Sequence, residues 1–240
     1  TNNSSHVNGV TFNNTLNGTV AGSTYANASN RVTVYQPAAT TVPMAIGILD
    51  CSASGNTFSY NRNNAQTIKA ATYFNLGILN GNTKSLAGET VVNGNLNIAN
   101  ATTLTVTASN FALSVAGNWS NSGVFAANSG TVTFNGSASQ TISPNTSNFY
   151  NVIFNNTAPG ANAIVLNDDV TITNLCTMTD GIINTGMNRL VLTNTTAANL
   201  SGFSNASYVN GNLRRHIANN TSTYAFPVGN GSNYYRADIK

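Results

Sequence analysis

Short alternations of apolar and polar residues recur along the whole chain and predict β-strands. They include Val10–Phe12, Val32–Val34, Leu104–Val106, Leu113–Val115, Val132–Phe134, Val170–Ile172 and Leu190–Leu192. A period of two puts the apolar side chains on one face of each strand and Thr, Ser or Asn on the other. Asn-Gly, Ser-Gly and Asn-Asn pairs between these segments predict tight turns. The pattern therefore predicts an all-β fold of short strands, each with one buried face.

A long internal repeat joins these strands into larger units. Residues 129–134 (Ser-Gly-Thr-Val-Thr-Phe) are similar to residues 54–58 (Ser-Gly-Asn-Thr-Phe), and a Gln-Thr-Ile string follows each copy, at Gln66 and again at Gln140. The two Gln residues are 74 positions apart. Internal repeats of this kind are typical of solenoid architectures, in which each unit buries its apolar face against its neighbours.

A shorter period lies within the long one. A single buried strand position can be followed at steps of 17 to 20 residues through Phe58, Leu76, Leu96, Val115, Val132, Val152, Val170 and Leu190. Four such steps span the long repeat, so the two periods agree. The spacing predicts a right-handed parallel β-helix (a β-solenoid) with rungs of roughly 19 residues, and about eleven to twelve stacked rungs would form a rod roughly 50–60 Å long. An array of β-sandwiches is the alternative, because evenly spaced strands suit that fold as well.

The regularity of the pattern varies along the chain and divides it into three parts. Residues 1–50 are expected to form irregular N-terminal solenoid rungs, and residues 51–199 the regular solenoid that carries the long repeat. The pattern changes after about Asn199, so residues 200–240 are expected to be an end cap or the start of a following β domain. We interpret the chain as a piece of a larger protein, with neighbouring domains of the same chain as its first partners.

Composition narrows the range of functions. Only 6% of the residues are charged, against about a quarter in an ordinary soluble domain. The basic residues are spread out apart from Arg214, Arg215 and His216, and nucleic-acid binding would need a denser basic stripe. No apolar run reaches the roughly 18 residues of a transmembrane helix. We therefore expect neither a nucleic-acid partner nor a transmembrane segment.

Several strings resemble those of large cell-surface repeat proteins of Bacteroidota. They are residues 117–123 (Gly-Asn-Trp-Ser-Asn-Ser-Gly), Gly130–Phe134, Gln140–Ile142, Phe149–Val152, and Phe226–Gly229 followed by Tyr235 and Arg236. The resemblance covers roughly residues 50–240. It implies β-helical adhesin or gliding-type proteins, which are type IX secretion substrates, and hence an extracellular location at the cell surface. These motifs are structural and carry no catalytic residue.

Few residues are available for chemistry. Parallel β-helices can carry polysaccharide hydrolases and lyases, and the adjacent Asp168 and Asp169 are the only acidic pair in the sequence. Turn residues that cap backbone amides explain such a pair more simply. Trp119, the single tryptophan, could stack on a sugar but suits a core position as well. Asp168, Asp169 and Trp119 are thus weak candidates for a glycan site. We expect no catalytic residue, no cofactor and no metal.

Two further features test the solenoid. Cys51 and Cys176 are 125 residues apart, about 30 Å along the predicted axis, so we expect two buried free thiols rather than a disulfide. Thr-x-Thr strings, at Thr105/Thr107, Thr131/Thr133, Thr171/Thr173 and Thr177/Thr179, would suit an ice-binding face only if they lay in register.

The sequence as a whole favours a non-catalytic structural and adhesive module of an extracellular bacterial surface protein or filament. Surface glycans and self-association are compatible partners of such a module. A carbohydrate-active or carbohydrate-binding β-helix and an ice-binding solenoid are the alternatives.

Overall fold

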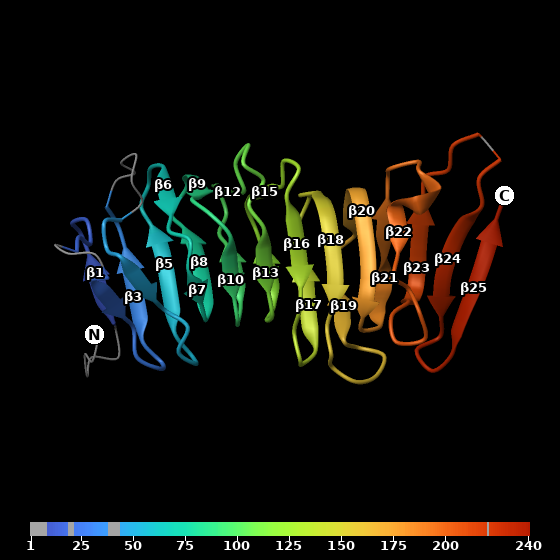
Figure 1. The fold of residues 1–240 in the computed structure, drawn as a ribbon, viewed down its shortest axis with the longest axis horizontal. Coiled ribbons are helices and arrows are strands. Elements are labelled where there is room, and N and C mark those ends of the chain that lie inside the picture. The colour runs from blue at the N-terminus through green and yellow to red at the C-terminus, as the bar shows by residue number, and fades with distance from the viewer. Residues whose placement is uncertain (1–8, 19–21, 38–43, 220) are drawn as a thin grey trace.

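The computed structural model describes residues 9–18, 22–37, 44–219 and 221–240, and these residues form an all-β, parallel β-solenoid of about nine turns. Figure 1 shows an elongated molecule whose strands cross its long axis, with β1 and β25 at opposite ends of the stack. Nearly all strand pairs are parallel, as expected where successive turns of one chain stack on each other. The solenoid predicted from the sequence is confirmed, and the β-sandwich alternative is excluded.

Each turn passes through up to three faces, which we number in chain order. The first face contains β1 (Val10–Phe12), β3 (Val32–Tyr35), β5 (Thr57–Asn61), β8 (Asn75–Leu79), β11 (Leu96–Ile98), β14 (Trp119–Asn121), β17 (Gln140–Ser143), β19 (Ile164–Leu166), the beginnings of β21 (Ile183–Leu192) and β23 (Val209–Arg215), and the end of β24 (Tyr224–Gly229).

The second and third faces are built in the same way. The second face contains β6 (Gln66–Ile68), β9 (Asn82–Leu86), β12 (Thr102–Thr105), β15 (Val124–Ala126), the beginnings of β18 (Phe149–Asn155) and β20 (Val170–Asp180), and the ends of β21 and β23. The third face contains β2 (Thr24–Ala26), β4 (Ile48–Asp50), β7 (Thr72–Tyr73), β10 (Thr90–Val92), β13 (Leu113–Val115), β16 (Thr131–Phe134), the ends of β18 and β20, and β22 (Leu200–Ser201). A short 3₁₀ helix, η1 (Ala197–Asn199), precedes β22.

The core fills the interior of the solenoid along its whole described length. Inward-facing side chains of successive turns stack in columns, such as Leu76, Leu96, Trp119, Ile142 and Leu166 on the first face, all at most 2% exposed. Such a stack buries the inward half of each strand while main-chain hydrogen bonds run lengthwise. Cys51 and Cys176 are free and buried in this core, as predicted.

The length of the turns differs from the constant step expected from the sequence. Cα partners on adjacent turns are 18 residues apart at Phe58 and Leu76 but 26 apart at Ile183 and Val209. Several turns are therefore longer than the roughly 19 residues expected from the sequence.

The strand position followed in the sequence also changes face. Leu96 pairs with Trp119 rather than Val115, and Val152 pairs with Cys176 rather than Val170. All three faces use the same alternation of apolar and polar residues, so a strand on the next face resembles the true partner. The single column inferred from the sequence was therefore wrong, although the parallel stacking was right.

The two copies of the 74-residue repeat also lie on different faces. Gln66 belongs to β6 on the second face, whereas Gln140 belongs to β17, which follows β5, β8, β11 and β14 on the first face. The repeat therefore spans three turns and two further faces, not four turns. Its local geometry is kept nonetheless: the buried Gln66 amide donates to the carbonyls of Tyr35 and Pro37, and Gln140 donates to those of Val115 and Gly117.

The C-terminal part of the chain leaves this pattern. β22 and β23 still stack in parallel on earlier turns, and β24 pairs in parallel with β23 at Val209 and Asn210. The chain then reverses, and β25 (Tyr234–Ile239) pairs antiparallel with β24. Residues 200–240 thus contain the last parallel strands and a terminal hairpin.

Candidate binding surfaces

Trp119 lies in the core and is only 1% exposed. Its ring makes edge-to-face contacts with Phe125, Phe134 and Phe149, at centroid distances of 4.9 to 5.9 Å. These contacts cover the ring, so Trp119 cannot stack on a sugar at the surface. The sequence allowed Trp119 either to stack on a sugar or to pack in the core, and in the structure it packs in the core.

Asp168 and Asp169 lie in the turn before β20. Oδ1 of Asp169 accepts a hydrogen bond of 2.9 Å from the main-chain N–H of Arg189 on the next turn, so this carboxylate caps a backbone amide. A carbohydrate-active site would need a cleft that holds both carboxylates. The hollows found in the described part of the chain are lined by other residues.

The Thr-x-Thr strings do not form a continuous ladder. Thr105 is in β12 on the second face, and Thr133 is in β16 on the third face. Thr171 pairs with Val191, and Ile153 separates Thr133 from Thr177 along their shared column. The regular face that ice binding would require is therefore interrupted at each of these positions.

Asparagine side chains join successive turns on the outside of the first face. Oδ1 of Asn75 accepts from the main-chain N–H of Asn95, Oδ1 of Asn95 accepts from that of Asn118, and Oδ1 of Asn118 accepts from that of Thr141. Each bond is 2.8 Å long.

Where such corners turn sharply, asparagine also adopts the left-handed conformation, as at Asn80, Asn110, Asn128 and Asn145. The exterior is thus a polar, nearly uncharged amide surface.

Lys84 is a buried cation whose importance the sequence did not reveal. Its side chain is fully buried, and Nζ donates to the carbonyls of Arg62, Asn64 and Gly81 at 2.6 to 2.8 Å. Burial, with a smaller effect from the nearby Arg62 guanidinium, lowers the pKa of Lys84 to about 8. All three donors of the ammonium group have acceptors, so Lys84 ties the corner between β5 and β6 to β9.

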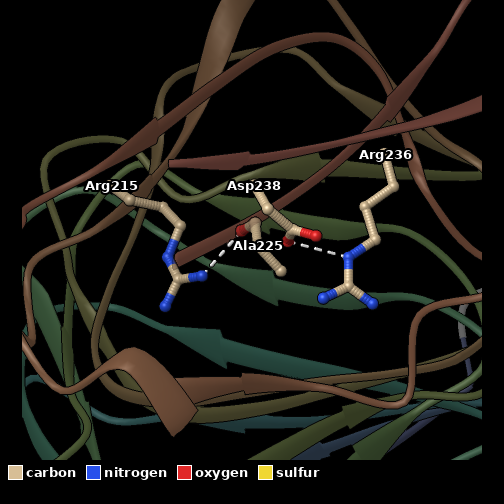
Figure 2. A network of polar contacts seen from close by, with 4 residues as sticks. All are labelled: Arg215, Ala225, Arg236 and Asp238. Atoms are coloured by element: carbon tan, nitrogen blue, oxygen red, sulfur yellow. Dashed lines mark hydrogen bonds and ion pairs between the residues drawn. The ribbon is translucent and has the colours of Figure 1, made fainter. Parts of the chain in front are cut away.

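Arg215 holds the terminal hairpin against the solenoid (Figure 2). Its buried guanidinium donates to the carbonyls of Ala197 and Ala225, each at 2.7 Å, and to Oδ1 of Asn199. The same group lies 5.3 Å from the ring centre of Tyr224. Figure 2 also shows the exposed ion pair between Arg236 and Asp238 of β25.

A hollow lies near Arg215, on the outside of the last turns. It is shallow, has a volume of about 520 Å³, and is lined by Met187, Arg189, Gly211, Asn212, Leu213, Arg214 and Val228. Leu190 pairs with Leu213, so Arg189 and Arg214 come from adjacent strands. The sequence analysis placed Arg214 in a local basic patch and did not consider Arg189. Their separation of 25 residues, about one turn, is the signal that would have linked them.

Comparisons with known proteins do not identify the chain. No protein-family model, curated protein or solved structure shows significant similarity to it.

Within the described ranges, no cluster of three or more His, Cys, Asp or Glu side chains is placed to bind a metal ion. No helix there is long and apolar enough to cross a membrane.

Proposed function

We propose that the chain is a non-catalytic structural and adhesive module of an extracellular bacterial surface protein or filament. The observation that carries this proposal is the unbroken parallel stacking of strands along the long axis, combined with an exterior of amides and hydroxyls. Main-chain hydrogen bonds between adjacent turns give a stiff rod. A flat polar exterior offers many hydrogen-bonding groups without a deep pocket.

Two features support this proposal over catalysis. The acidic pair that a polysaccharide hydrolase would use includes Asp169, which caps a backbone amide. The hollows on the surface of the described residues are shallow and open, unlike the concave, enclosing sites that small-molecule substrates occupy. The resemblance to Bacteroidota surface proteins supports the extracellular location, and neighbouring domains of the same chain would be its first partners.

Adhesion can be measured directly with beads that carry the purified chain. We expect them to be retained under flow on surfaces coated with polysaccharides, and we expect beads coated with albumin to wash off. Retention equal to that of albumin on every polysaccharide would contradict the adhesive function.

The cellular location needs a separate measurement. An antibody against the chain should label intact cells of the source organism, and labelling only after the cells are permeabilised would contradict a surface location.

A further inference from the structure

The hollow near the C-terminal end exists because the last turn is only partly covered. β24 pairs with β23 at Val209 and Asn210, and the chain then reverses into β25. The strand segment from Asn212 to Arg214 therefore has a ladder partner on β21 but none on β24. This uncovered segment forms one wall of the 520 Å³ hollow.

Two arginines line this hollow, although the chain has only nine lysines and arginines in total. Arg189 and Arg214 are both exposed. Arg189 pairs with Asn212 and Arg214 pairs with Val191, so the two arginines lie diagonally opposite each other on adjacent strands. Among the described residues, the ion pair found is Arg236 with Asp238, so neither arginine has a carboxylate partner. The carboxylate of Asp169, on the preceding turn, accepts from the main-chain N–H of Arg189.

The other residues of the hollow suit a sugar ring. Met187 is 96% exposed, and the half-buried Leu213 and Val228 lie beside it, so apolar atoms are available to contact C–H groups. The Nδ2 group of Asn212 donates to the carbonyl of Asn188 at 3.0 Å. Its Oδ1 atom is left to accept a hydrogen bond from a ligand hydroxyl.

We propose that this hollow binds a carboxylate-bearing polysaccharide, such as a uronate polymer, with Arg189 and Arg214 donating to its carboxylates. A guanidinium fork matches the two oxygens of a carboxylate, which favours this ligand over a neutral glycan. Two arginines are too few for the dense basic stripe that nucleic acid requires. The inference rests on the adhesive function proposed above and names the ligand class for one site of that surface.

The test uses the intact chain, with polygalacturonate as the probe and dextran as the neutral comparison. We expect polygalacturonate to bind and dextran not to bind at low salt. Arg189→Gln and Arg214→Gln should each weaken polygalacturonate binding by about tenfold, and the double variant should abolish it. Lys69→Gln, which removes the same charge far from the hollow, should bind like the wild type. Thermal melting of each variant checks that the fold is kept.

Three results would overturn the assignment. The first is wild-type affinity in the double variant, and the second is equal weakening by Lys69→Gln. The third is single-stranded DNA binding as tightly as polygalacturonate and losing affinity in the same variants, because the hollow would then be a general polyanion site. If beads still adhere to neutral polysaccharides while polygalacturonate fails to bind, this inference falls and the adhesive function stands.

Discussion

At the residue scale, buried polar side chains stabilise the corners of the solenoid by donating hydrogen bonds to main-chain carbonyls. Gln66, Gln140 and Lys84 are buried, and each donates to two or three main-chain carbonyls at a corner. A buried carbonyl without a donor costs about 1–3 kcal/mol, so these side chains decide whether a corner is stable. The pattern of apolar and polar residues does not reveal these positions. A buried, hydrogen-bonded lysine cannot be distinguished from an exposed lysine in the sequence.

Lys84 provides the sharpest residue-level prediction. Lys84→Met should lower the free energy of unfolding by about 2–4 kcal/mol, because three partly buried carbonyls lose their donor. Urea denaturation at pH 7 would measure this loss. Lys69→Met is the matched control and should change stability little, and an equal loss in both variants would contradict the assigned role.

The same residue should also give the protein a pH dependence. The pKa of Lys84 is about 8 in the folded chain and near 10.5 in the unfolded chain. Between these values the unfolded chain holds the proton that the folded chain has released, so stability rises with pH over this window. The difference in unfolding free energy between wild type and Lys84→Met should therefore grow from pH 8 to pH 10.5. A constant difference would show that the Lys84 pKa is not lowered.

At the element scale, Arg215 is one of the side chains that hold the terminal hairpin, together with Tyr224, whose hydroxyl donates to the Thr195 carbonyl. Arg215→Leu removes the hydrogen bonds to Ala197, Ala225 and Asn199 that join β24 to the last turns. Amides of β24 and β25 should then exchange with solvent deuterium about tenfold faster or more, while amides of β11 and β14 stay unchanged. The neighbouring exposed residue offers a control, Arg214→Leu, which should leave the hairpin protected. Equal protection in Arg215→Leu would show that strand pairing alone holds the hairpin.

The strands also show how much of the fold could be predicted from the sequence. Alternation and repetition predicted strands, parallel stacking and the free thiols, because these depend on local pattern and chain length. The same signals could not assign a strand to its face, since Val115 and Trp119 are both buried strand residues and only pairing with Leu96 tells them apart. Nor could they locate the hollow, whose arginines become neighbours only when the lengths of individual turns are known.

At the scale of the whole molecule, ion pairs contribute little to stability. The described residues contain one ion pair, between Arg236 and Asp238, and both side chains are more than 40% exposed. Exposed pairs contribute about 0–1 kcal/mol. The melting temperature should therefore change by less than about 2 °C between 0.05 and 0.5 M NaCl, as measured by circular dichroism. A larger shift would mean that long-range charge interactions hold the turns together.

The displacement of the 74-residue repeat by one face has a consequence for longer chains. Each copy of the motif is turned by about one third of a revolution relative to the copy before it, because three turns and two faces separate them. A fibre extended by further duplications would carry equivalent corners on a spiral, and the direction of the first copy would recur at every third copy after it. Any ligand recognised by such a corner would then meet the fibre from all sides.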